Sequence, residues 1–232
     1  MNQNTTTAVV VPERRPMFTR DWNISKQLTR WLVAGKVSPN AISLIGMAGG
    51  IIAGLALAAT TLPGLALAMY LIAAAGIIVR ALGNLLDGMV AVASGKASPL
   101  GELFNEVPDR VSDIAILIGA GCATGSNATL GLLAALVAVL VAYVRAEGKV
   151  VGASQHYCGP MAKPERMLVI FLIALYCGLT PAHWQPAMQI GHQQFGLMSI
   201  GFAIIVAGGM ITAVRRLKRI AKEASTSYPL KK

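Results

Sequence analysis

The sequence is poor in charged residues and in cysteine, and both shortages exclude whole classes of protein. Only 13% of its 232 residues are charged while 55% are hydrophobic, and the mean hydropathy of +0.61 lies outside the range of soluble globular chains. The three cysteines, Cys122, Cys158 and Cys177, lie far apart without a CxxC pair. Neither a disulfide framework nor a zinc site is therefore indicated, and we expect one membrane domain.

The N-terminal region lacks a basic start followed by an apolar core, so it does not have the pattern of a cleavable signal peptide. We expect residues 1–18 to form a disordered cytoplasmic tail. Residues 19–37 place Trp22, Leu28 and Trp31 among several basic side chains, a pattern typical of an interfacial amphipathic helix in the headgroup layer. A solvated linker is the alternative interpretation.

Lysine and arginine are missing from alternate connections between the apolar stretches. Six such stretches, two of them short, predict six transmembrane helices near residues 41–59, 65–86, 111–123, 130–144, 167–179 and 195–214. The connections near 60–63, 125–129 and 180–194 carry no Lys or Arg, whereas all twenty basic residues fall on the other side. The positive-inside rule therefore predicts that both termini are cytoplasmic.

The expected fold class is an all-α membrane protein in which the interfacial helix precedes six transmembrane helices. The six-helix membrane domain would cover residues 38–216, and a basic cytoplasmic tail would cover 217–232. The formal net charge of +10 could indicate nucleic acid, but basic residues confined to one membrane side indicate lipid headgroups instead. No nucleic-acid partner is expected.

Acidic and amide side chains gather at the cytoplasmic ends of the second and third stretches. At about 100° per residue, Asn84 and Asp87 share one helical face with Arg80, and a second face collects carboxylates at successive turns. The members of that second face are Glu102, Asn105, Glu106, Asp109 and Asp113. Crowded carboxylates favour a bound cation, and hard oxygen ligands suit Mg²⁺ or Mn²⁺, which also bind phosphates.

Two other interpretations of this cluster stay open. The acids could pair with Arg80, Arg110, Arg145 and Arg166 as a neutral interhelical network, because charges inside membranes are usually paired. They could also belong to an ion-coupled transporter, which would need polar residues spread along a path through the bilayer. The later stretches contain almost no ionisable residues at mid-depth, which disfavours the transporter.

The spacing of the polar residues resembles the signature of the CDP-alcohol phosphatidyltransferase family, D-x2-D-G-x2-A-R-x8-G-x3-D-x3-D. Every interval matches, and the frame here reads Asn84-x2-Asp87-Gly88-x2-Ala91-Val92-x8-Gly101-x3-Asn105-x3-Asp109. Three further segments look like motifs of the same family, namely Ser38-Pro39-Asn40, Tyr143-x-Arg145-Ala146-Glu147 and Pro164-Glu165-Arg166. The resemblance thus covers most of the chain.

The resemblance implies a role for each matching position. The metal ligands would be Asn84, Asp87, Asn105 and Asp109, holding Mg²⁺ or Mn²⁺ against the donor pyrophosphate, with Asp109 also deprotonating the acceptor hydroxyl. The CDP moiety would contact Asn40, Gly88, Ala91 and Gly101. Arg145, Lys163 and Arg166 have the chemistry to clamp an acceptor phosphate, or they are only charges that orient the chain in the membrane.

The sequence departs from the signature at Asn84, Asn105 and Val92, which replace two aspartates and the arginine. An amide oxygen carries no charge and binds a metal more weakly, but Glu102, Glu106 and Asp113 lie on the same face as possible compensating acids. We expect a divergent enzyme that transfers a phosphatidyl group from CDP-diacylglycerol to an alcohol, for instance a polyol phosphate such as glycerol phosphate, and releases CMP. An inactive CDP-lipid-binding protein is the alternative.

The partners expected on this basis are the CDP-alcohol donor, a small alcohol acceptor and membrane lipid, with a homodimer implied by the resemblance alone. The absence of an organelle address fits a bacterial inner membrane. Two segments of small residues, Gly46–Gly50 and Gly208–Gly209, permit close contact between helices.

Overall fold

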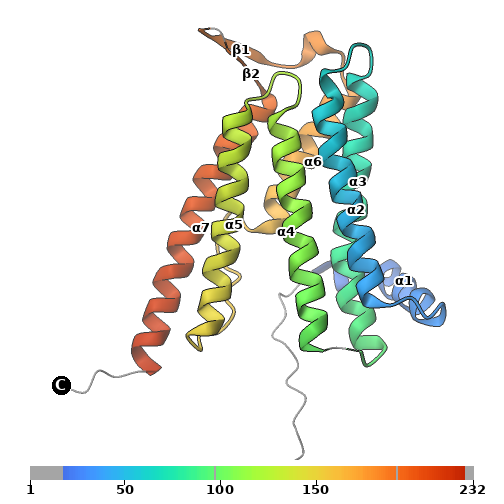
Figure 1. Ribbon diagram of the computed structural model, residues 1–232, viewed down its shortest axis with the longest axis vertical. Coiled ribbons are helices and arrows are strands. Elements are labelled where there is room, and N and C mark those ends of the chain that lie inside the picture. Colours follow the sequence, from blue (N-terminus) through green and yellow to red (C-terminus); the bar gives the residue numbers. More distant parts are fainter. Residues whose placement is uncertain (1–17, 97, 192, 228–232) are drawn as a thin grey trace, which may run out of the picture.

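The structure is a computed structural model that describes residues 18–96, 98–191 and 193–227. Helices dominate the fold and form one bundle (Figure 1). The α-helices are α1 (Asn23–Ala34), α2 (Pro39–Ala58), α3 (Ala66–Ala93), α4 (Pro99–Gly121), α5 (Ala128–Val150), α6 (Lys163–Leu179) and α7 (Leu197–Ser227). Short 3-10 turns at Phe18–Asp21, Ala59–Thr61 and Ala182–Trp184 and a two-stranded hairpin complete the described chain.

Four of the described helices are long and apolar enough to cross a membrane. They cover Pro39–Thr61, Ala66–Ala93, Ala128–Val150 and Leu197–Thr226. The other two bundle helices, α4 and α6, are the two segments whose apolar stretches are short in the sequence, because α4 begins with charged turns and α6 has only 17 residues. The broad expectation of an all-α membrane protein is confirmed, whereas the count of six spans stays a prediction.

The helices extend beyond the apolar stretches that the sequence marks. α3 ends at Ala93 instead of near residue 86, and α4 begins at Pro99 instead of near residue 111. The Ser98 hydroxyl accepts a hydrogen bond from the Gly101 amide at 3.0 Å and so caps α4. With 28 residues α3 is about 42 Å long, against roughly 30 Å for a bilayer core, so its polar end projects past the apolar layer.

Glycine allows α2, α3 and α4 to pack closely. A Cβ at Gly83 of α3 would lie 2.8 Å from the Cα of Gly46 in α2, so no larger residue fits there without moving a helix. A Cβ at Gly50 would collide with Ser112 of α4. The small residues of α2 therefore serve contacts within the chain and do not supply the face of a homodimer.

The main apolar core fills one end of the bundle. It includes Leu57, Tyr70, Ile116, Ile170 and Phe202, which come from α2, α3, α4, α6 and α7 and are all buried. These positions lie toward the ends of α2 and α4 and the start of α3, so one compact cluster joins helices distant in sequence.

A β-hairpin closes the same end and was not expected from the sequence. Strands β1 (Ala187–Ile190) and β2 (Gln193–Gly196) pair antiparallel, with Ala187 opposite Gly196. Gly191 adopts a positive φ of 61° in the turn, which glycine tolerates without strain. Figure 1 shows the hairpin beside the α2–α3 and α4–α5 connections, so the three connections without Lys or Arg gather at one end.

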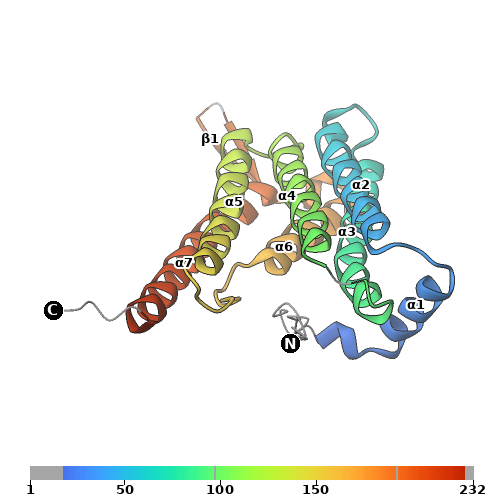
Figure 2. The same ribbon diagram turned by 60° about the horizontal axis from the view of Figure 1, so that its bottom comes forward.

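Helix α1 lies outside the bundle beside the end of α3 in both views (Figure 1 and Figure 2). Its polarity is inverted relative to a helix of a soluble protein, because Ser25 and Thr29 are buried while Ile24 and Trp31 are 68% and 72% exposed. The tail expected over residues 1–18 falls outside the described residues except for Phe18. At the other terminus the 217–232 segment is helical as far as Ser227.

Candidate active site

One cavity collects the residues that the sequence singled out. It lies at the end of the bundle opposite the hairpin and is walled by α2, α3, α4, α5 and the start of α6. Of the fourteen residues proposed from the sequence, all but Asp113 line it: Asn40, Asn84, Asp87, Gly88, Ala91, Gly101, Glu102, Asn105, Glu106, Asp109, Arg145, Lys163 and Arg166. Helical periodicity and the family resemblance together therefore selected residues that line one cavity.

Asp87 is the buried carboxylate of α3. Its Oδ2 accepts a hydrogen bond of 2.7 Å from the Ser43 hydroxyl of α2, and its Oδ1 accepts one from the Gly88 amide. It has no basic partner among the residues that the structure describes. The carboxylate lines the cavity and is held in place by hydrogen bonds, without a salt bridge to any described residue.

Arg80 couples α3 to α4. Its guanidinium, only 3% exposed, lies 2.9 Å from Asp109 Oδ1 and 2.7 Å from Asp113 Oδ1, and its Nε donates to the Ser112 hydroxyl at 3.2 Å. Asp113 is 2% exposed and lies 3.6 Å from Arg166 Nη2. Asp113 therefore lies behind the cavity wall and pairs with arginines. The sequence suggested it as a compensating acid of the site, but it does not line the cavity.

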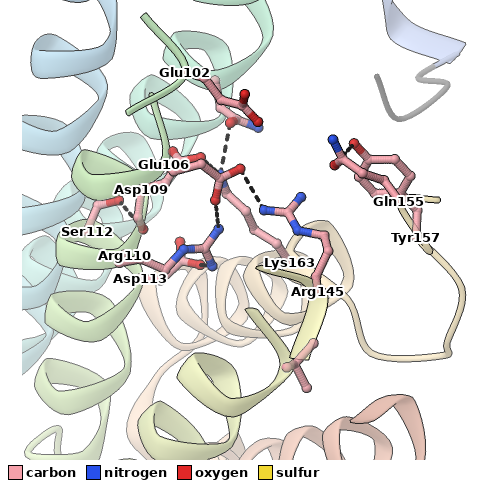
Figure 3. Close-up of polar contacts among 12 residues, drawn as sticks. Glu102, Glu106, Asp109, Arg110, Ser112, Asp113, Arg145, Gln155, Tyr157 and Lys163 are labelled. Atoms are coloured by element: carbon pink, nitrogen blue, oxygen red, sulfur yellow. Dashed lines mark hydrogen bonds and ion pairs between the residues drawn. The ribbon is translucent and has the colours of Figure 1, made fainter. Parts of the chain in front are cut away.

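Lys163, the first residue of α6, reaches between two of the motif positions. Its ammonium donates to Asn84 Oδ1 at 2.9 Å and forms an ion pair with Asp109 Oδ2. Figure 3 shows this side chain extending from α6 toward Asp109. Burial lowers the pKa of Lys163 to about 8, against the opposing pull of Asp109, so the ammonium form prevails at pH 7.

Glu106 is held by two arginines from different helices. Arg145 of α5 lies 2.6 Å from Oε1 and Arg110 of α4 lies 2.9 Å from Oε2 (Figure 3). Burial raises the pKa of Glu106, but Arg145 and then Arg110 more than offset it and lower it to about 2. Arg145 also lies over the Tyr157 ring at 5.7 Å, and Glu102 pairs with Lys149.

The paired network that the sequence left open is therefore present. Four of the five carboxylates that α3 and α4 bring to this end have basic partners among the described residues, and Asp87 is the exception. Six basic side chains take part: Arg80, Arg110, Arg145, Lys149, Lys163 and Arg166. Crowding of the acids alone thus does not demand a metal ion, because resident cations already compensate most of their charge.

The motif positions fit a metal ion unevenly. In the part of the chain that the structure describes, no group of three or more His, Cys, Asp or Glu side chains is arranged to hold one. Asn105 Oδ1, however, is buried and accepts no hydrogen bond from any described residue, and an orphaned buried acceptor calls for a partner. Together with Asp87, which has no salt bridge to a described residue, it offers the hard oxygen ligands that Mg²⁺ and Mn²⁺ prefer, whereas Asn84 and Asp109 already hold Lys163.

Several cavity residues escaped the sequence interpretation. They are Arg20, Ser43, Lys96, Gln155, Tyr157 and Arg216. Ser43 lies three residues after Asn40, so the helical period could have placed it on the same face. Arg216, the last residue of the expected membrane domain, is 4% exposed and donates to the carbonyls of Val141 and Cys158.

A family model for CDP-alcohol phosphatidyltransferase matches residues 36–214. The chain is 29% identical over 155 residues to inner membrane protein YnbA of Escherichia coli, covering 67% of this chain and 75% of that protein. It is 27% identical over 222 residues to phosphatidylinositol phosphate synthase of Streptomyces avermitilis, covering 91% of this chain and 82% of that enzyme. Both relatives extend over most of the membrane domain.

Solved structures show the same fold at lower identity. Mycobacterium tuberculosis phosphatidylinositol phosphate synthase with CDP-DAG bound aligns with a TM-score of 0.69 at 17% identity, covering 91% of this chain and all of that one. The same enzyme in complex with manganese and citrate aligns with a TM-score of 0.70 at 17% identity, covering 89% and 93% of the two chains. At this identity the likeness establishes the fold alone.

Proposed function

The chain belongs to the CDP-alcohol phosphatidyltransferase family, and from that premise we propose that it transfers a phosphatidyl group from CDP-diacylglycerol to an alcohol and releases CMP. The observation that carries this proposal is the cavity. It brings together the four polar side chains of the family motif, which are Asn84, Asp87, Asn105 and Asp109. The protein would work in phospholipid biosynthesis.

The donor would bind where the cavity wall is made of small residues. Gly88 and Ala91 of α3 and Gly101 of α4 line the cavity beside Asn40 of α2. A Cβ at Gly101 would meet only the Ser98 hydroxyl within 4 Å, so this position is open toward a ligand. The mycobacterial structure with CDP-DAG bound supports the choice of donor.

Mg²⁺ or Mn²⁺ is proposed as the cofactor, with Asp87 and Asn105 as the residues that fit it best. A divalent cation supplies charge neutralisation of the donor pyrophosphate, which makes CMP a better leaving group. The structure of the mycobacterial enzyme with manganese supports this cofactor. Ser43 would orient the Asp87 carboxylate for this task through its 2.7 Å hydrogen bond.

Asp109 is proposed as the general base that accepts the proton of the acceptor hydroxyl. Both of its oxygens are engaged, Oδ1 by Arg80 and Oδ2 by Lys163. Each carboxylate oxygen keeps a further lone pair, so Asp109 can accept the hydroxyl proton while both contacts stay in place. Arg80 would keep the carboxylate aimed meanwhile.

The acceptor is proposed to carry a phosphate, for example as glycerol phosphate or inositol phosphate. Arg145, Lys163 and Arg166 form a basic wall on the α5 and α6 side of the cavity. Arg145 is the most accessible of the three, at 19% exposure of its side chain, and Arg166 is almost fully buried. The naming of the Streptomyces relative as a phosphatidylinositol phosphate synthase supports a phosphorylated polyol.

For the membrane arrangement we propose six spans, with α4 and α6 crossing beside the four long helices, and both termini and the active site in the cytoplasm. The gathering of connections without Lys or Arg at the opposite end supports this orientation. The outward apolar side chains of α1 support an interfacial helix. The Escherichia coli relative is an inner membrane protein, which supports the same location.

A catalytically inactive protein that binds CDP-lipid is the second candidate, favoured by one observation. The motif supplies amides at Asn84 and Asn105, and Lys163 occupies acceptor atoms of two motif residues. A homodimer would be compatible with either function and rests on the family resemblance.

The test is CMP release by the detergent-purified full chain with CDP-diacylglycerol and Mg²⁺ or Mn²⁺, using a panel of polyol phosphates and amino alcohols. Metal-dependent release that is lost in Asp109→Asn establishes the transferase and identifies the acceptor. Binding of the CDP-lipid without release, whatever the metal or acceptor, establishes the inactive binding protein instead.

A further inference from the structure

We infer that the Lys163 ammonium takes the place of a divalent cation between Asn84 and Asp109, so that the site binds a single divalent metal ion, at Asp87 and Asn105. The inference rests on the proposed function, because it concerns the same cavity and the same donor. It reassigns Lys163 from an acceptor clamp to a fixed charge of the catalytic centre.

The first support is position. Lys163 Nζ lies 2.9 Å from Asn84 Oδ1 and is paired with Asp109 Oδ2, so one ammonium links the first and the last position of the motif across α3 and α4. A metal ion coordinated by the same two oxygens would need the space that the ammonium fills. An ammonium has three donors, and one stays available to a ligand oxygen.

The second support is the residue type at position 84. An aspartate there would carry a charge suited to a divalent cation, whereas the asparagine carbonyl is a neutral acceptor suited to a hydrogen bond from an ammonium. The neutral amide at position 84 and the ammonium at the start of α6 therefore match each other within one contact. Without Lys163, Asn84 would only be a weaker metal ligand than an aspartate. With Lys163, Asn84 binds an ammonium in place of a metal ion.

The third support is the charge around the cavity. Four of the five carboxylates that α3 and α4 bring to this end already have basic partners, and Arg20, Lys96 and Arg216 also line the cavity. Each divalent ion adds two positive charges, so a second one would enter a region where cations already outnumber acids. One divalent ion instead matches Asp87, the single one of these carboxylates without a salt bridge to a described residue.

The remaining half of the motif has the atoms for that single ion. Asp87 has no basic partner in the described chain, and Asn105 Oδ1 is buried without a hydrogen-bond donor among the described residues. Both line the cavity. The four motif positions therefore divide into a pair filled by Lys163, Asn84 with Asp109, and a pair still open, Asp87 with Asn105.

The test is the number of Mn²⁺ ions bound per chain, measured by equilibrium dialysis and electron paramagnetic resonance on the detergent-purified full chain with CDP-diacylglycerol present. We expect one Mn²⁺ in the wild-type protein. We expect two in the double variant Asn84→Asp with Lys163→Met, because the ammonium is removed and the missing carboxylate is restored. Lys163→Arg, which keeps the charge, should retain one.

Lys218→Met is the control, since Lys218 lies in α7 and is not among the residues that line the cavity, and it should leave the count at one. Two ions, or none, in the wild-type protein would overturn the inference whether or not any variant folds. A double variant that elutes as a folded protein and still binds only one Mn²⁺ would overturn it as well.

CMP release measured on the same samples separates this inference from the proposed function. Two bound ions with CMP release refute the single-ion site and leave the transferase standing. One bound ion without CMP release supports the single-ion site and refutes the transferase.

Discussion

Helices α3 and α4 change in chemistry along their length. Toward the hairpin, Tyr70 and Ile116 belong to an apolar cluster with Leu57 and Phe202, whereas from the middle of both helices toward the cavity Arg80, Asp109 and Asp113 form buried ion pairs. Apolar contacts are non-directional and lose free energy in proportion to the atoms removed. A buried ion pair behaves otherwise, because removal of one partner leaves the other charged and unsolvated.

This difference predicts that the two ends respond to substitution in separable ways. Damage at the apolar end should lower stability and spare the chemistry of the folded fraction. Damage at the polar end should affect ligand binding and catalysis even where the fold survives. The following variants test that contrast and are given in order of decreasing expected effect.

Arg80→Met should have the largest effect, because it strands Asp113 in the bundle interior and removes one of the two partners of Asp109. We expect a loss of about 3 to 5 kcal/mol of unfolding free energy, measured as a fall in thermal stability in detergent, together with loss of CMP release. The double variant with Asp113→Asn should recover part of the stability, since the stranded charge is removed. A single variant as stable as the wild type would contradict the assignment.

Leu57→Ala tests the apolar end. Leu57 is fully buried in the main cluster, so its truncation should destabilise the chain by roughly 3 kcal/mol. At a temperature where the variant remains folded, the Mn²⁺ affinity and the CMP release per folded molecule should match the wild type. Loss of Mn²⁺ binding by the folded variant would mean that the two ends are not independent.

Ser43→Ala removes the hydroxyl that donates to Asp87 at 2.7 Å. Loss of such a supporting hydrogen bond should weaken Mn²⁺ binding on the order of 10-fold, while the unfolding free energy falls by only about 1 kcal/mol. Ser94→Ala, which removes a hydroxyl just after α3 that donates to the Val90 carbonyl outside the cavity, is the control and should not change Mn²⁺ affinity. Equal Mn²⁺ affinities for the two variants would argue against Asp87 as a ligand.

Glu106→Gln should have the smallest effect and should appear as a change in pH dependence. The pKa of Glu106 is lowered to about 2 in the folded chain, so its stabilising contribution is present above the unfolded pKa near 4.5 and is lost as the pH falls from about 4.5 toward 2. The variant should lose less stability than the wild type over that interval, as followed by thermal unfolding at stepped pH. Because Glu106 is partly exposed, the difference should be well under 1 kcal/mol. Identical pH profiles would contradict the ion pairs with Arg145 and Arg110.

The wall of the cavity could be predicted from the sequence because helical periodicity alone determines which residues share a face. That period places Asn84 on one face with Asp87 and places Asn105 on another face with Asp109. The spacing of the family motif further predicts that these two faces meet. The helix ends could not be predicted in the same way, because hydropathy declines where the charged turns of α4 begin although the helix continues to Pro99.

The sequence could not predict which charged side chains pair with one another. Lys163 lies 54 residues after Asp109 in the chain, and only the packing of α6 against α3 brings its ammonium to the motif. The hairpin was missed for a different reason, since strands of four residues such as β1 are too short for alternation to be recognised.

The length of α3 determines how far the cavity lies from the hairpin end of the bundle. An apolar layer of about 20 residues from Ala66 ends just short of Asp87, so the reactive groups stand at the height where lipid headgroups begin. Under the proposed function, a donor lipid would present its pyrophosphate there with its acyl chains still in the bilayer, and a polar acceptor would arrive from water. Removing one helical turn between Ala66 and Arg80 would move the cavity by about 5 Å toward the bilayer centre. The donor pyrophosphate and the polar acceptor would then have to enter the apolar layer.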